Sequence, residues 1–214
     1  MSEKRRDNRN RILHEGEYQR TDGRYRYRYI DEDGKEKNAE KPCNIGHLRR
    51  NARLIWRYKT MIKILFVCHG NICRSPMGEF VLKDLVEKRG YAGELHIESA
   101  ATSAEEIGNP VYPPARRELE RHGISCRGKT ARQVTKADYD AFDYILYMER
   151  YNYPRLMRVL GGDPENKCHR LLDFTKHPGD IDDPWYTGDF DGVYRQITEG
   201  CQAFLAYLEE RHGF

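Results

Sequence analysis

Apolar residues follow two different periods after Met61. Residues 62–67 form a short apolar run rich in β-branched side chains, which predicts a buried strand. A turn with glycine comes next, and Pro76 is typical of a first helical position. The apolar residues that follow recur every four positions, as on one helix face: Met77, Val81 and Leu85. The pattern therefore predicts strand, loop and helix, ending at Gly90, which is the first unit of a parallel α/β sheet.

Strands and helices continue to alternate along the rest of the chain. Three further short strands are predicted, at 95–98, 144–148 and 170–172. Helices are predicted at 113–122, which a proline pair opens, and at 191–211, where apolar residues are three or four apart. We therefore expect an α/β fold with a small doubly wound sheet. Ligands of such sheets bind beyond the carboxyl ends of the strands, where the loop that starts at Cys68 lies.

Composition narrows the class of protein. The chain has 214 residues with 38% hydrophobic side chains and no apolar run of the length that a membrane span needs. Its first residues lack the apolar stretch of a signal peptide. The cysteines are too scattered for a disulfide framework: Cys43, Cys68, Cys73, Cys126, Cys168 and Cys201. We expect a cytoplasmic protein without a membrane partner.

Charge is divided unevenly between the two parts of the chain. Residues 1–60 carry 17 Lys and Arg against 10 Asp and Glu, a net charge of +7, whereas the remaining residues carry 20 against 24, a net charge of −4. A basic segment of this kind fits either an anionic polymer as partner or a solvated tail.

The loop that starts at Cys68 carries the clearest chemistry. It reads Cys-His-Gly-Asn-Ile-Cys-Arg-Ser-Pro at 68–76, so a helix begins where a cysteine and an arginine lie six positions apart. Inward-pointing N–H groups and the positive end of a helix suit a tetrahedral dianion and favour the thiolate of Cys68. Arg74 can hold two phosphate oxygens, and Ser75 can stabilise the sulfur as a leaving group. The remaining residues of this predicted phosphate-binding loop are His69, Gly70, Asn71, Ile72 and Cys73.

A second segment supplies the acid that attack on phosphorus requires. The sequence Asp-Asp-Pro-Trp-Tyr at 182–186 places Asp183 before a proline that fixes the loop. Asp183 can protonate the leaving oxygen and then activate water. Trp185 and Tyr186 can wall the entrance and stack on an aromatic substrate.

Together these segments resemble the low molecular weight protein tyrosine phosphatases. Further stretches carry the resemblance in the same order, at 99–110, 131–135 and 142–149. It implies a four-stranded parallel sheet flanked by helices and a two-step reaction without cofactor or metal. In that reaction Cys68 takes the phosphoryl group from a phosphotyrosine-containing protein substrate and becomes a phosphocysteine. It also implies that Asn71 and Ser99 hold the loop in shape.

Three positions refine the resemblance. Cys73 matches a loop cysteine that can form a reversible disulfide with the nucleophile, although a small buried side chain there is an equal alternative. Ile72 lies where the protein-arginine phosphatases of the family carry threonine, which favours phosphotyrosine over phosphoarginine. Glu105 lies at the predicted wall of the substrate pocket, where many relatives have an aromatic residue. A thiol-dependent arsenate reductase is disfavoured because no cysteine occurs at 135–148 to relay a disulfide.

Residues 4–37 resemble the N-terminal DNA-binding domain of conjugative-transposon integrases, which lays a three-stranded sheet in the major groove. Arginine alternates with tyrosine over 24–29, which would place cations on one face of a strand, and Asp33 and Gly34 indicate a hairpin turn. Residues 38–60 predict no further strand, only a short basic helix at 48–58, and Cys43 with His47 is not a metal site. We expect a hairpin-like or disordered truncated segment whose DNA binding, through residues 5–37, is weak.

These patterns predict three parts: an integrase-like segment at 1–37, a basic linker at 38–60 and a phosphatase domain at 61–214. The first hypothesis is a protein tyrosine phosphatase. The alternative is a DNA-associated protein in which the basic segment directs the enzyme to DNA.

Overall fold

Strand β4 (Ile62–Cys68) is an inner strand of a four-stranded parallel sheet. The strand order is β5-β4-β6-β7, and all three neighbouring pairs run parallel. The other strands are β5 (Leu95–Ala101), β6 (Tyr144–Tyr147) and β7 (Cys168–Arg170). This computed structural model describes residues 17–19, 25–30, 36–41 and 61–213. The chain divides into two units, Met1–Tyr58 and Lys59–Phe214.

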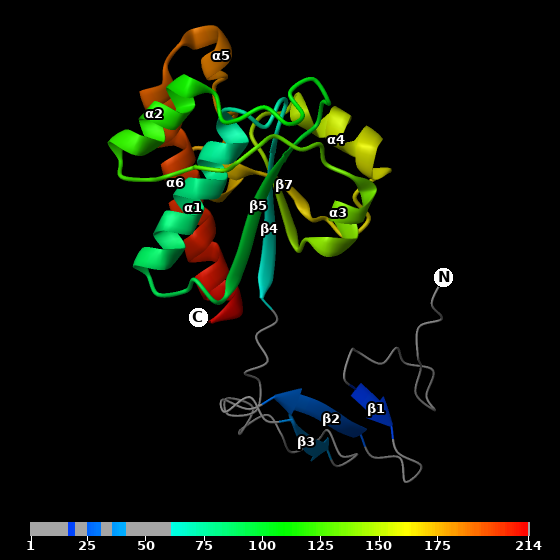
Figure 1. Ribbon diagram of the computed structural model, residues 1–214. Coiled ribbons are helices and arrows are strands. Elements are labelled where there is room, and N and C mark those ends of the chain that lie inside the picture. The colour runs from blue at the N-terminus through cyan, green and yellow to red at the C-terminus, as the bar shows by residue number, and fades with distance from the viewer. Residues whose placement is uncertain (1–16, 20–24, 31–35, 42–60, 214) are drawn as a thin grey trace. The chain divides into compact units, whose positions relative to one another are not determined.

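Helices cover both faces of this sheet (Figure 1). Side chains alternate along β4, so Ile64 and Phe66 join one buried apolar cluster and Leu65 and Val67 join another. The first cluster lies under α1, α2 and α6, and the second lies under α3 and α4. The bounds of these helices are α1 (Arg74–Lys88), α2 (Pro113–Arg121), α3 (Lys136–Ala141), α4 (Asn152–Leu160) and α6 (Phe190–His212).

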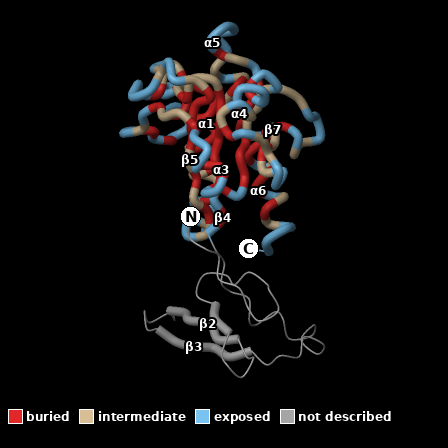
Figure 2. The backbone as a smooth tube through the Cα atoms, turned by 90° about the vertical axis from the view of Figure 1, so that its right-hand side faces the viewer, coloured by how far each residue is buried: buried red, intermediate tan, exposed pale blue. Residues whose placement is uncertain are grey.

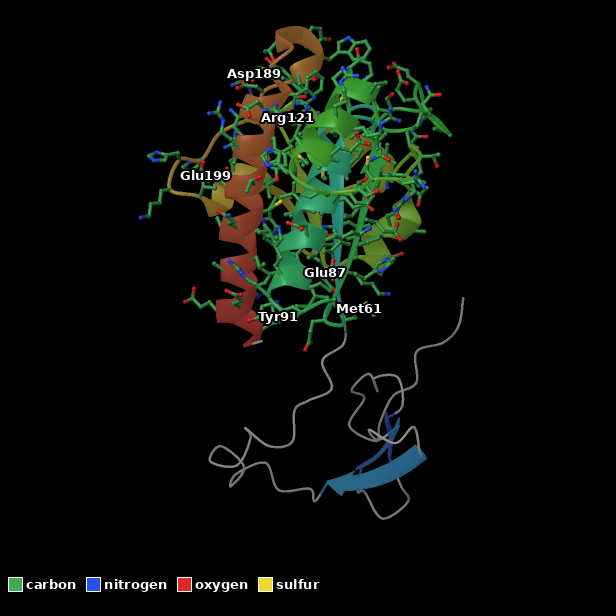
Figure 3. The ribbon with its side chains drawn as sticks, turned by 60° about the vertical axis from the view of Figure 1, so that its left-hand side comes forward. Met61, Glu87, Tyr91, Arg121, Asp189 and Glu199 are labelled. Atoms are coloured by element: carbon green, nitrogen blue, oxygen red, sulfur yellow. The ribbon has the colours of Figure 1, made fainter. Side chains whose placement is uncertain are left out.

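The core follows the strands, as the buried positions in Figure 2 show. Helices α1 and α6 run side by side (Figure 3). Each carries a glycine that lets it approach a neighbouring side chain closely. A Cβ atom on Gly78 of α1 would lie 2.7 Å from the Phe66 ring, and one on Gly200 of α6 would lie 2.6 Å from Leu171. The first contact fixes α1 tightly on β4, so the loop between them is held at both ends, and the second fixes α6 against the residue that follows β7.

The predicted strands and helices of this unit are confirmed with shifted bounds, except that the strand predicted at 170–172 shares only Arg170 with β7. Helix α1 begins at Arg74, so Pro76 lies within its first turn, where the N–H groups have no helical partner in any case. The last strand, β7, ends at Arg170, and a 3₁₀ helix, η2 (Leu171–Phe174), follows it. Residues 170–172 therefore belong mainly to that helix, which buries Leu171 and Leu172.

Two helices were missed by the sequence patterns. Helix α3 has a capping box in which Thr135 and Asp138 bind each other's backbone, a signal that is visible in the sequence. Helix α4 buries only three of its nine residues, so its apolar face is narrow. A further single turn, α5 (Pro184–Thr187), lies in the acid segment.

The N-terminal unit contains a three-stranded antiparallel sheet of order β1-β2-β3. The expected hairpin is formed by β2 (Tyr25–Ile30) and β3 (Glu36–Lys41), with Tyr27 opposite Ala39. The structure adds a third strand, β1 (Glu17–Gln19), on the other edge of β2, and β3 runs into the predicted linker. The predicted turn at 33–34, the helix at 48–58 and Cys43 with His47 lie outside the described residues.

No helix among the described residues is both long and apolar enough to cross a membrane.

Candidate active site

The loop between β4 and α1 wraps around the sulfur of Cys68. The Asn71 N–H points at this sulfur at 3.3 Å, and the Ser75 hydroxyl lies 3.0 Å from it. Asn71 has a left-handed backbone with a φ of 58°, which asparagine tolerates better than most residues. The positive end of the 15-residue helix α1 adds to these donors. The arrangement suits an anion on the sulfur or next to it.

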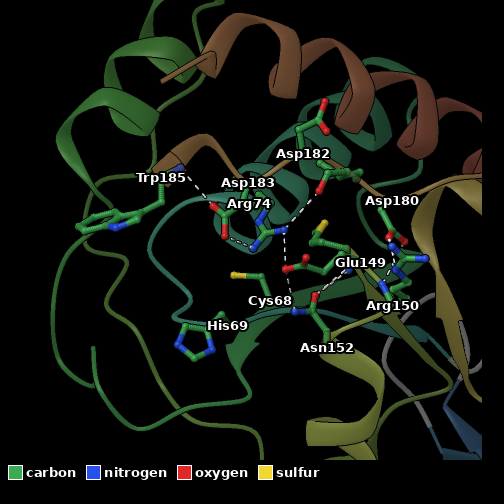
Figure 4. A network of polar contacts seen from close by, with 12 residues as sticks. Cys68, His69, Arg74, Glu149, Arg150, Asn152, Asp180, Asp182, Asp183 and Trp185 are labelled. Atoms are coloured by element: carbon green, nitrogen blue, oxygen red, sulfur yellow. Dashed lines mark hydrogen bonds and ion pairs between the residues drawn. The ribbon is translucent and has the colours of Figure 1, made fainter. Parts of the chain in front are cut away.

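Arg74 links this loop to two distant carboxylates (Figure 4). Its guanidinium is 2% exposed and pairs with Glu149 at 2.8 Å and with Asp183 at 2.5 Å. It also donates to the Ile181 carbonyl at 3.3 Å. Burial alone would lower the pKa of Arg74, but the negative groups at Cys68, Asp183 and Glu149 outweigh burial and raise it. The guanidinium is therefore a permanent, oriented cation next to the thiol.

Asp183 reaches the site from the start of the short helix α5. One carboxylate oxygen pairs with Arg74, and the other accepts the Trp185 N–H at 3.1 Å as an N-cap. The Trp185 ring is 57% exposed and tilts against Tyr112, with 5.2 Å between the ring centroids. Tyr186 is 86% exposed. The acid segment thus carries a carboxylate on its inner side and aromatic rings at the mouth.

A buried chain of hydrogen bonds supports the loop from behind. The Asn71 side-chain amide donates to Ser75 at 2.9 Å and to Ser99 at 2.8 Å. Ser99 donates in turn to Glu79 at 2.6 Å, and Lys129 pairs with the same Glu79 oxygen at 2.8 Å. Because Asn71, Ser75, Ser99 and Glu79 are buried, each must keep its partner to avoid the cost of desolvation. The predicted structural roles of Asn71 and Ser99 fit this geometry.

The other predicted loop residues differ in their surroundings. Ile72 packs against the main apolar cluster, and its carbonyl accepts the Tyr112 N–H at 2.8 Å. Burial, followed by the nearby Cys68, raises the pKa of Cys73 to about 12, so this thiol stays protonated at neutral pH. Whether Cys73 forms a disulfide with Cys68 stays a prediction, and all five cysteines of residues 61–213 are free thiols.

Sequence reasoning missed four side chains around the site: Glu79, Lys129, Glu149 and Arg155. Glu149 follows β6, at the same sheet edge as Cys68, and this position beyond a strand end was the available signal. Among the described residues, no three His, Cys, Asp or Glu side chains lie close enough together to hold a metal ion. The groups at this centre are instead suited to a phosphate oxyanion, a thiol nucleophile and a proton donor.

Comparison with known proteins agrees with this geometry. Residues 63–212 match the family of low molecular weight phosphotyrosine protein phosphatases. The chain belongs to this family. The resemblance inferred from the sequence is therefore confirmed, and with it the four-stranded parallel sheet flanked by helices.

Individual members of the phosphatase family are similar over nearly their whole length. The low molecular weight protein-tyrosine-phosphatase YfkJ of Bacillus subtilis is 41% identical over 152 residues, which cover 70% of this chain and 97% of that protein. The human low molecular weight phosphotyrosine protein phosphatase is 41% identical over 147 residues, covering 66% and 92%. The crystal structure of YfkJ superposes with a TM-score of 0.69 over 71% of this chain and 97% of that one.

The N-terminal segment matches a different family. Residues 1–40 match the DNA binding domain of tn916 integrase. The match covers the three strands β1, β2 and most of β3.

Proposed function

We propose that this protein hydrolyses phosphotyrosine in protein substrates through a phosphocysteine intermediate. The observation that carries the proposal is the meeting of Cys68, Arg74 and Asp183 at one sheet edge, although they lie far apart in the sequence. A thiol beside a fixed guanidinium and a carboxylate supplies a nucleophile, an anion clamp and a proton donor.

The first step transfers the phosphoryl group to sulfur. The Cys68 thiolate attacks phosphorus, and the bond between phosphorus and the tyrosine oxygen breaks. Arg74 and the loop N–H groups hold the equatorial oxygens, and Asp183 gives its proton to the departing phenol oxygen. For this step Asp183 must exchange its pairing with Arg74 for a contact with the leaving group, because the phosphate takes the guanidinium donors.

The second step regenerates the enzyme. Asp183, now ionised, takes a proton from water, and the water oxygen attacks phosphorus. The bond between sulfur and phosphorus breaks, and the sulfur leaves as a thiolate. The Ser75 hydroxyl, 3.0 Å from the sulfur, stabilises that negative charge by donating a hydrogen bond. Inorganic phosphate is the product.

An aromatic substrate is favoured by the side chains of Ile72, Trp185 and Tyr112. Ile72 offers no hydroxyl to a guanidinium group, and the exposed Trp185 ring with Tyr112 offers a face on which a phenyl ring can stack. The test is hydrolysis of matched phosphotyrosine and phosphoarginine peptides. We expect a clear preference for phosphotyrosine, and a preference for phosphoarginine would contradict the assignment. The nucleophile's need for a free thiol fits a reducing, cytoplasmic location.

A second function is favoured by the N-terminal unit. We propose that residues 1–37 bind DNA weakly, that residues 38–60 link them to the enzyme, and that residues 61–214 form the phosphatase domain. The three-stranded sheet, the match of residues 1–40 and the charge of +7 before residue 61 support this. DNA binding by the full chain should weaken steeply with salt, and a shift assay from 50 to 200 mM salt measures this. Salt-independent binding, or none at 50 mM, would contradict it.

A further inference from the structure

Three charged or polar side chains form a row at the mouth of the site. The His69 ring lies between Glu105, at 2.9 Å from Nε2, and Arg155, at 2.5 Å from Nδ1. Arginine can only donate hydrogen bonds, so Nδ1 of His69 accepts from Arg155. The Nε2–H group of His69 then donates to the Glu105 carboxylate. His69 therefore joins the Arg155 guanidinium on one side to the Glu105 carboxylate on the other.

Arg155 lies on helix α4, whose first residue, Asn152, is next to the site. It lies three positions after Asn152, whose side chain accepts the N–H groups of Met148 and Glu149. Residues three apart on a helix are neighbours on its surface, so Arg155 continues the face that starts beside Glu149. Arg155 contacts His69, the residue that directly follows Cys68 in the catalytic loop.

Among the described residues Arg155 forms no close ion pair with a carboxylate, although its charge adds to the larger effect of His69 in lowering the pKa of Glu105. Its one hydrogen bond to these residues goes to His69, which leaves most of its donors open to solvent. Arg150, just before α4, is different because Asp180 pairs with it at 3.5 Å. Arg155 is thus an exposed, oriented cation that can accept a further anion.

The two sides of the mouth therefore differ in chemistry. One side has the aromatic rings of Trp185 and Tyr112, which suit the phenyl ring of the substrate. The other side has the row Arg155, His69 and Glu105, where an apolar ring would find only charged or polar partners. In Figure 4 the His69 ring lies on the opposite side of the Cys68 sulfur from Asp183. If the phenyl ring lies against Trp185 and Tyr112, this second side is left for the peptide residues next to the phosphotyrosine.

We propose that Arg155, positioned by His69, selects phosphotyrosine that has an acidic residue within two positions along the peptide. The inference rests on the proposed phosphatase function and adds a substrate preference to it. Two residues of extended peptide span about 7 Å, which lets a neighbouring carboxylate reach a guanidinium beside the catalytic loop. Glu105 repels the same carboxylate on its own side, so the preference depends on the position of the acidic residue.

The experiment measures kcat/KM of the full-length protein on matched phosphotyrosine peptides that carry Asp or Asn at one of the four nearest positions. The ratio of the Asp to the Asn value should be about two to five in at least one position, as for an exposed ion pair. Arg155→Gln should bring the ratio to about one, and Arg155→Glu should invert it. Arg158→Gln removes another exposed arginine of α4 and should leave the ratio unchanged.

The possible failures are distinguishable. No hydrolysis of phenyl phosphate by the unmodified protein would overturn the proposed function itself. Hydrolysis without any preference for Asp, or a preference that survives Arg155→Gln, would overturn only the inference. Loss of the preference in Arg158→Gln as well would show a diffuse charge effect and would also overturn it. Added salt at 1 M should weaken the preference in the unmodified protein, since it screens exposed charges, and a salt-independent preference would contradict the assignment to Arg155.

Discussion

The phosphate loop and the acid segment meet at Arg74 but are built in opposite ways. In the loop, Asn71 and Ser75 are fully buried, and Ser99 behind them is also fully buried. In the acid segment, the side chain of Asp183 is 24% exposed and those of Trp185 and Tyr186 are mostly exposed. The loop is held by side-chain hydrogen bonds at both its front and its back, whereas the acid segment is a single helical turn with one ion pair to the loop.

This difference separates two requirements of the proposed reaction. An anion site must be oriented before substrate binds, because donors that have to reorganise contribute less to the transition state. An acid must instead change partners during each cycle, from Arg74 to the leaving oxygen and then to water. A buried, fully bonded acid could not do so at low cost. Variants on the two sides should therefore fail in different ways.

The largest effect is expected at the nucleophile. Cys68→Ser should lower turnover of phenyl phosphate by about 10³-fold or more, because the hydroxyl stays protonated and is a weaker nucleophile. The loop donors remain, so phosphate should still protect the variant against thermal unfolding. Steady-state kinetics and a thermal melt with and without phosphate measure both. Turnover close to that of the unmodified protein would remove Cys68 from the mechanism.

The acid segment should show a smaller loss that depends on the leaving group. Asp183→Asn should reduce turnover of phosphotyrosine by about 10²- to 10⁴-fold, since the amide cannot donate the proton. The loss should be smaller for para-nitrophenyl phosphate, whose leaving group needs less protonation. Asp182→Asn is the matched control, because this neighbouring carboxylate is exposed and bonds Gln196. An equal loss in both variants, or equal losses for both substrates, would contradict the role of Asp183.

The catalytic residues and the side chains that support them differ in how far the sequence predicts them. Cys68 and Arg74 lie six positions apart between a strand and a helix, and Asp183 comes before a proline turn, so short-range patterns identified them. The contacts of Glu79, Lys129 and Glu149 depend on how α1, β5 and β6 are placed in the fold. No local pattern encodes a pairing across 50 residues, such as Lys129 with Glu79. The same limit applies to Arg155. Nothing in the sequence distinguishes it from the other arginines, and only the fold brings it to His69.

The support behind the loop should contribute to both stability and rate. Ser99→Ala removes one acceptor from Asn71 and one donor to Glu79, which leaves buried polar atoms short of partners. We expect a loss of about 1–3 kcal/mol in the free energy of unfolding, and a fall in kcat of roughly 10- to 100-fold from a misplaced loop. Denaturant unfolding and kinetics measure these. Ser125→Ala, on an exposed loop, is the control and should change neither; an equally small effect of Ser99→Ala would contradict the supporting role.

The smallest effect is expected at the exposed rim of the acid segment. Trp185→Ala removes a ring that is more than half exposed and contacts Tyr112, so stability should change little. If the ring stacks on the substrate, KM for phosphotyrosine should rise about two- to tenfold while kcat stays nearly constant, because an aromatic pair contributes to binding before and during the reaction alike. Trp185→Phe should restore most of the lost affinity.

An aliphatic phosphate is the control substrate, because it has no ring to stack on Trp185. Its turnover, although slower than that of phosphotyrosine, should be the same in the unmodified protein, Trp185→Ala and Trp185→Phe. A fall in kcat instead of a rise in KM would mean that Trp185 acts by positioning Asp183, to which its N–H is bonded. Trp185 would then serve to position the catalytic acid and not to bind the phenyl ring of the substrate.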